Sequence, residues 1–82
     1  MPYANSYSRE ESLDGIETIT FPWKPKTLQI TNDSISNNLQ FKFNASETYR
    51  TLKPYETYCG EGISIRNLYL SGTVDYRVWG TG

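Results

Sequence analysis

Reactive side chains are few in this chain of 82 residues, and their spacing matches no known catalytic arrangement. Histidine, the commonest general base at neutral pH, is absent. Cys59 is the single cysteine, so no second thiol in the chain can form a disulfide with it and no histidine can activate it. Because Cys59 follows Thr57 and Tyr58 in a predicted strand, we expect a small buried side chain rather than a nucleophile.

Carboxylates are the remaining candidates for acid–base chemistry or metal binding. Glu47, Glu56, Glu61 and Asp75 fall in predicted turns or on the polar face of a strand, where such groups usually face solvent. The sequence Asn-Asp-Ser at positions 32–34 groups several oxygen atoms, but it is also typical of an ordinary turn, and no spaced acidic series follows it. We therefore expect no enzyme activity, no metal and no cofactor.

The charge and hydropathy of the chain exclude further classes of partner. A formal net charge of −1 predicts no strong attraction to nucleic acid or to an anionic membrane. No segment approaches the ~20 consecutive apolar residues of a membrane-spanning helix, and the first residues lack the pattern of a secretory signal. The sequence predicts a protein made in a cytoplasm that binds neither nucleic acid nor membrane.

The pattern of the chain from Gly15 onward predicts an all-β fold, as a small antiparallel β-sandwich of the jelly-roll or immunoglobulin-like type. Short runs of β-branched and aromatic residues alternate with Pro, Gly, Asn, Asp and Ser, and Leu39, Phe41 and Phe43 share the face expected to line the core. A bulge or a strand break is expected near residues 66–67, and Ser71 with Gly72 predicts a tight hairpin. The expected strands cover residues 16–21, 27–31, 39–43, 49–52, 57–59, 63–70 with the interruption at 66–67, and 74–79.

The polar residues 1–14 show neither strand nor helix periodicity and predict an extended N-terminal arm, with residues 15–82 forming the sandwich domain. Trp23 stands close to two prolines, and Trp79 falls on the strand face opposite to its apolar neighbours, so both are expected to be exposed. Aromatic side chains carry much of the contact energy at interfaces, although they also pack well within sheets. The expected partner-binding residues are Tyr3, Tyr7, Trp23, Tyr55, Tyr69 and Trp79.

Four segments in the second part of the chain also resemble segments of a known group of proteins. They read TLQITND (27–33), LQFKF (39–43), TLKPYET (51–57) and LYLSGTVDYRVW (68–79). In this order they resemble small β-sandwich virion proteins of tailed bacteriophages. The resemblance implies a structural subunit of the virion, of the capsid decoration or tail and neck accessory type.

The sequence thus favours a virion protein that contacts the major capsid or tail protein and copies of itself, as a homo-oligomer in the assembled particle. A domain of this length has a small core, which a neighbouring subunit would stabilise. A carbohydrate-binding module that contacts host glycans is the alternative, since exposed Trp and Tyr rings stack on sugars. A binder of single-stranded nucleic acid is the third possibility, which salt dependence would reveal.

Overall fold

The computed structural model describes residues 6–61 and 65–81, which form strands and turns and no helix. The six strands are β1 (Ser6–Thr20), β2 (Thr27–Asn32), β3 (Leu39–Lys42), β4 (Arg50–Leu52), β5 (Thr57–Glu61) and β6 (Asn67–Thr81). The all-β class predicted from the sequence is confirmed. A search of these residues finds no helix with the length and apolar character needed to cross a membrane.

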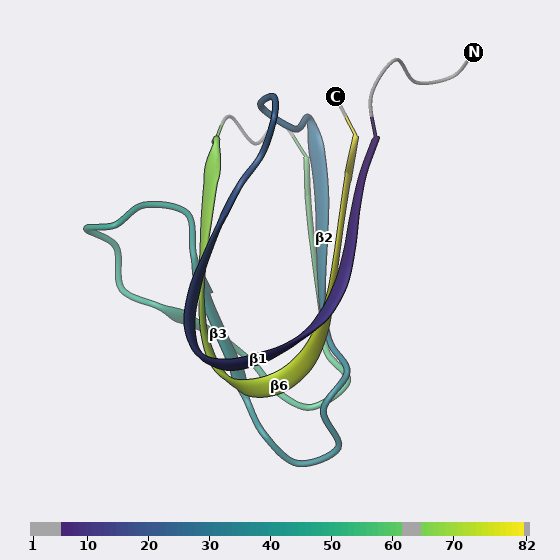
Figure 1. The fold of residues 1–82 in the computed structure, drawn as a ribbon, viewed down its shortest axis with the longest axis vertical. Helices are drawn as coiled ribbons and strands as arrows, with labels where there is room; N and C mark the ends of the chain where they lie inside the picture. Colours follow the sequence, from purple (N-terminus) through teal and green to yellow (C-terminus); the bar gives the residue numbers. More distant parts are fainter. Residues whose placement is uncertain (1–5, 62–64, 82) are drawn as a thin grey trace.

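The strands pair antiparallel in one curled sheet of order β4-β3-β6-β2-β5, and β1 lies along β6. The long strand β6 changes partner: residues 69–71 pair with β3, and residues 76–81 pair with β2. Figure 1 shows β1 and β6 bending together into a U, so that the two halves of the sheet face each other. We call the half that contains β2 and β5 the first layer, and the half that contains β3 and β4 the second layer.

Two glycines allow this bend. Gly15 and Gly72 lie opposite each other on β1 and β6, with φ angles of 111° and 142° that side chains with a Cβ rarely adopt. A Cβ on Gly72 would also lie 2.9 Å from the backbone oxygen of Asn38. The tight hairpin predicted at Ser71 and Gly72 is therefore wrong, because β6 continues through both residues and the glycine serves a bend instead of a chain reversal.

The predicted arm of residues 1–14 is also wrong where the structure describes it. Residues 6–14 form the first part of β1 and pair with residues 73–81 of β6, so the sheet extends across the predicted boundary between residues 14 and 15. Residues 1–5 lie outside the described residues. The strand escaped detection because Arg9 and Glu11 occupy the inward positions between Tyr7 and Leu13, which removes the alternation of apolar and polar residues.

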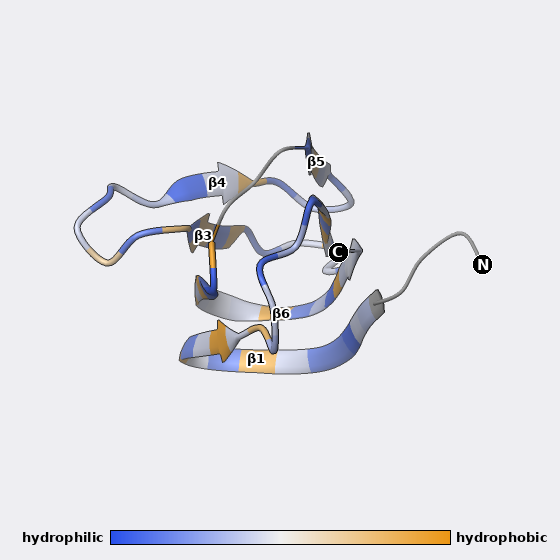
Figure 2. Ribbon diagram, turned by 90° about the horizontal axis from the view of Figure 1, so that it is seen from above, coloured by the Kyte–Doolittle hydropathy of each residue, from blue (hydrophilic) through white to orange (hydrophobic). Residues whose placement is uncertain are grey.

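The core lies between the two layers and receives side chains from both. Leu28 and Ile30 of β2 face it from the first layer, and Leu39 and Phe41 of β3 face it from the second, as the alternation predicted. Figure 2 shows hydrophobic segments within β3 and β6, and hydrophilic segments interrupted by hydrophobic ones along β1. The buried apolar side chains are Leu13, Ile19, Phe21, Leu28, Ile30, Leu39, Phe41, Leu52, Leu68, Leu70, Val74, Tyr76 and Val78. Burial of each larger side chain contributes about 1.5–3 kcal/mol before the loss of chain entropy is counted.

A polar cluster closes the β1 side of the core. The Arg9 guanidinium donates to the Tyr76 hydroxyl at 3.0 Å and to the carboxylate of Glu17, and the Tyr76 hydroxyl donates to Glu17 at 2.8 Å. Arg9 and Glu17 lie on opposite sides of the bend, so the cluster joins the two halves of β1. Burial raises the pKa of Tyr76 to about 12, and its hydrogen bond to Glu17 acts in the same direction. Inward-pointing charges of this kind on an edge strand also discourage pairing with a foreign strand.

Asn32, at the end of β2, organises the turns at that end of the molecule. Its side chain is fully buried, and its amide donates to the backbone oxygens of Asn37 at 2.8 Å and Leu52 at 3.0 Å. Its own backbone oxygen accepts from the Tyr55 amide at 2.8 Å. Asn32 thus fixes the β2–β3 connection against the predicted turn between β4 and β5, in which the Glu56 amide donates to the Lys53 oxygen at 3.0 Å.

Candidate binding face

The aromatic residues expected to bind a partner do not gather in one place. Trp79 lies on the outer surface of the first layer and is 41% exposed. Tyr69 is half-buried on the second layer, where its ring lies 5.8 Å from the amino group of Lys42. Tyr55 is 66% exposed at the turn between β4 and β5. These three residues therefore belong to separate regions, and of the two on strand β6, Trp79 is the more exposed.

The remaining aromatic candidates are held by the domain itself or lie outside the described residues. Tyr7 is half-buried, and its ring packs edge-on against Phe21 with the centroids 5.0 Å apart. Trp23 is half-buried in the β1–β2 connection, and its indole nitrogen is buried without an acceptor in the part of the chain that the structure describes. Tyr3 lies outside the described residues. Neither Tyr7 nor Trp23 therefore presents a freely exposed ring to a partner.

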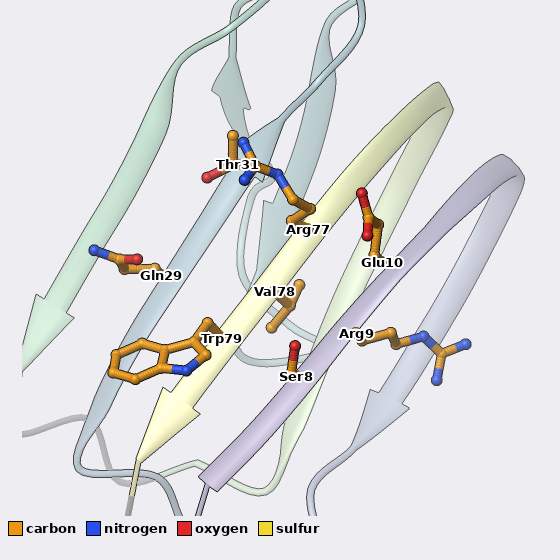
Figure 3. Close-up of a pocket in the computed structure, with 8 residues that line it drawn as sticks. All are labelled: Ser8, Arg9, Glu10, Gln29, Thr31, Arg77, Val78 and Trp79. Carbon is orange, nitrogen blue, oxygen red and sulfur yellow. The ribbon is translucent and has the colours of Figure 1, made fainter.

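Trp79 lies within a polar surface built from four strands, which we call the Trp79 face. Two cross-strand rows form it, because the register of β1, β6, β2 and β5 aligns alternate residues. The first row is Ser8, Trp79, Gln29 and Cys59. The second row is Glu10, Arg77, Thr31 and Thr57. Six of these side chains, with Arg9 and Val78, line a shallow hollow of about 360 Å³, and Figure 3 shows the indole of Trp79 beside Gln29 and Ser8.

Ion pairs and hydrogen bonds hold the polar side chains of the Trp79 face in place. Arg77 binds Asp33 through two hydrogen bonds of 2.7 and 3.0 Å, which raise the pKa of Arg77 above its ordinary value. The hydroxyls of Thr31 and Thr57 form a hydrogen bond of 3.0 Å. These contacts are exposed, so they orient the side chains more than they stabilise the fold.

The chemistry available on this surface is that of hydrogen bonding, charge and aromatic contact. No group of three or more His, Cys, Asp or Glu residues that could hold a metal ion occurs among residues 6–61 and 65–81. Cys59, predicted to be a small buried side chain, is exposed on β5, and that prediction is wrong. It lies next to Gln29, whose amide nitrogen is 3.5 Å from the sulfur, because the alternation of β5 directs Cys59 outward. Glu47, Glu56, Glu61 and Asp75 are exposed, as predicted.

Sequence reasoning missed several members of the Trp79 face. Ser8 and Glu10 belong to it only because residues 6–14 form a strand, and no apolar alternation signals that strand. Arg77, like Trp79, alternates with the apolar residues of β6, so its position on the outer surface could be predicted from the sequence. Ile35 lies outside the Trp79 face, is 78% exposed in the β2–β3 connection and has no pattern around it that marks it as a contact residue.

The arrangement of the strands relates this chain to solved structures. A protein of unknown function from Vibrio parahaemolyticus is 15% identical, with a TM-score of 0.53 and coverage of 93% of each chain. A cupin superfamily protein from Desulfitobacterium hafniense is 9% identical, with a TM-score of 0.56 and coverage of 99% of this chain and 80% of that one. No protein-family model matches the chain, and no curated protein matches it in sequence. These likenesses show the fold, which is all-β and built from a curled antiparallel sheet.

The comparisons overturn the prediction that the chain is not an enzyme. A cupin superfamily protein shares the fold, so the fold itself does not mark the chain as a protein without catalytic activity. The absence of histidine is thus an insufficient reason to exclude catalysis. Since identities this low relate folds alone, the comparisons assign no reaction or substrate to this chain.

Proposed function

We propose that this chain is a structural subunit of a bacteriophage virion, of the capsid decoration or tail and neck accessory type, which binds its partner through the Trp79 face. The observation that carries the proposal is the exposure of Trp79 on a regular strand surface, beside ordered polar side chains. Tryptophan is among the residues that most often dominate the energy of a protein interface. The resemblance in the segments between residues 27 and 79 supplies the virion context.

The size of the domain also supports a role within an assembly. Only about 60–65% of the surface of a chain this short is buried on folding, so binding by a partner adds a useful increment of stability. The partner in this proposal is the major capsid or tail protein, together with further copies of the chain in the particle. The predicted arm no longer contributes to the proposal, because residues 6–14 belong to β1.

Within the all-β class, we propose the jelly-roll type over the immunoglobulin-like type. Both β1 and β6 run through the bend and contribute to the two facing layers. A jelly roll also wraps paired strands into two facing sheets, whereas an immunoglobulin-like sandwich assigns most strands to one sheet each. This arrangement leaves the outer surface of the first layer open for a partner.

A carbohydrate-binding module that contacts host glycans is the second candidate function. The observation that favours it is the pair of hydrogen-bonding side chains next to the indole of Trp79, those of Ser8 and Gln29, with Thr31 in the lining of the same hollow. An aromatic ring with adjacent hydroxyl and amide groups suits the apolar face and the hydroxyl groups of a sugar. Both candidate functions use the Trp79 face, so one variant tests them together.

The decisive experiment replaces Trp79 with alanine and measures incorporation into particles and binding to a glycan array separately. Tyr55→Ala is the matched control, because it removes an exposed aromatic ring from a different part of the molecule. We expect Trp79→Ala to reduce incorporation about tenfold or more while Tyr55→Ala leaves it unchanged. Loss of glycan binding alone would favour the carbohydrate-binding module, and no effect of Trp79→Ala on either property would refute both candidates.

A further inference from the structure

Three neighbouring hollows on the outer surface of the first layer join into one groove along β1 and β6. The hollow beside Trp79 shares Glu10 and Arg77 with a second hollow of about 450 Å³. The second hollow shares Ser12, Asp33 and Asp75 with a third, of about 460 Å³. Because each hollow shares lining residues with the next, the three hollows adjoin along this surface.

The ends of this groove are apolar. Trp79 lies at one end, and Ile35, which is 78% exposed, lies in the lining of the third hollow. The groove follows residues 73–79 of β6, a distance of about 20 Å at ~3.3 Å per residue. An extended peptide of about seven residues has this length. The length of the groove thus matches that of a single extended peptide segment.

The middle of the groove carries an excess of negative charge. The carboxylates in its lining are those of Glu10, Glu11, Asp14, Asp33 and Asp75. Two arginines also line the groove. Arg77 forms an ion pair with Asp33, and the guanidinium of Arg9 donates to Tyr76, Glu11 and Glu17. Asp14 and Asp75 therefore stand beside the groove without a cation in the ion pairs of the described residues, and Glu10 lies opposite Arg77, whose charge is already shared with Asp33.

We propose that this groove binds an extended segment of a partner protein that carries Lys or Arg side chains in its middle and one apolar side chain at each end. The central cations meet Glu10, Asp14 and Asp75, and the apolar ends contact Trp79 and Ile35. This inference rests on the proposed function, since it specifies the chemistry of the partner that the Trp79 face recognises.

The same charges disfavour other occupants. A nucleic-acid strand would bring phosphates against the carboxylates, and like charges repel. A second copy of the chain that docked through the same groove would place Glu10 and Asp75 near its own acidic side chains. An uncharged oligosaccharide fits beside Trp79 but leaves the carboxylates of the second and third hollows without a cationic partner.

The test is a selection from a library of random eight-residue peptides against the full chain, followed by affinity measurements on the selected peptides. We expect the selected peptides to carry two or more Lys or Arg residues in the middle, with an aliphatic or aromatic residue at each end. Selection of acidic or uncharged sequences, or of none above background, would overturn the inference. The incorporation assay with Trp79→Ala does not use the peptides, so the proposed function can stand when this inference fails.

Variants that remove single charges test whether a selected peptide binds in the groove. The double variant Glu10→Gln, Asp75→Asn should bind a selected peptide with about three- to tenfold lower affinity than the unmodified chain, and added salt should reduce this difference. The matched control is Glu61→Gln, which removes an exposed carboxylate on β5 outside the three hollows. Equal weakening by Glu61→Gln would show a general charge effect and overturn the inference. Displacement of the peptide by an uncharged hexasaccharide with equal affinity, or by dimerisation of the chain, would also overturn it.

Discussion

Replacement of the paired glycines at the bend tests the fold most directly. Gly15→Ala places a Cβ in open space, because no atom lies within 4 Å of it, so its cost comes only from the φ angle of 111°. Backbone conformations of this kind cost about 1–3 kcal/mol for a residue with a side chain. Gly72→Ala carries the same type of cost at a φ angle of 142°, and its Cβ also lies 2.9 Å from the backbone oxygen of Asn38. Since that oxygen belongs to the backbone, the β2–β3 connection must move.

We therefore expect Gly72→Ala to lower the free energy of unfolding by about 3 kcal/mol or more and Gly15→Ala by less. For a domain of this size the total is about 4–12 kcal/mol, and each 1 kcal/mol corresponds to a shift in Tm of about 4–8 °C. Urea denaturation followed by tryptophan fluorescence measures both variants. Thr48→Ala, an exposed position outside the strands, is the control and should change stability by no more than about 0.5 kcal/mol. Equal losses of stability for the two glycine variants would refute the clash between a Cβ at position 72 and the Asn38 oxygen. Unchanged stability in both variants would refute the conclusion that the bend requires glycine.

Three further variants test other parts of the structure by the same urea measurement. The pKa of Tyr76 is raised from about 10 in the unfolded chain to about 12 in the folded chain, so the folded state holds the proton more tightly. The resulting contribution to the free energy of unfolding is complete below pH 10 and is lost as the pH rises to 12. Tyr76→Phe should thus lose less stability than the unmodified chain between pH 10 and 12, and parallel losses would contradict the cluster with Arg9. Tyr55→Gly should raise stability by about 1 kcal/mol, since Tyr55 has a φ angle of 66° at a turn position that favours glycine. Asn32→Ala should lower stability by about 1–3 kcal/mol because it leaves two backbone oxygens without their donor, and a neutral result would exclude this role.

The sequence predicted the strands that follow simple alternation and missed what depends on distant contacts. Leu28 and Ile30 of β2, like Leu39 and Phe41 of β3, are buried as their spacing indicated. The first part of β1 was missed because its inward positions hold Arg9 and Glu11, which form an ion pair with each other, while Arg9 also binds Glu17 and Tyr76 from more distant positions in the folded chain. Ser-Gly pairs also suit hairpins, and nothing local distinguishes a hairpin from a bend in a continuous strand.

The candidate site was predictable only in part. Strand alternation placed Trp79 on the outer surface, whereas Tyr7 was proposed as part of the N-terminal arm and Trp23 from the two prolines beside it, and both are half-buried. The partners of Trp79 across the sheet depend on the register between β1, β6 and β2, and register is set by the complete fold. The groove as a whole follows from that register, so the sequence alone could not reveal it.

The pairing of β1 with β6 also has a kinetic consequence. Among the described strands, β1 is synthesised before the other five, yet the strand that it pairs with, β6, follows all of them in the chain. Closing so long a loop carries an entropic cost before any contact compensates it, and folds dominated by distant pairings are slow to form. The nascent chain therefore completes its core only after synthesis of β6, the strand with which β1, β2 and β3 all pair.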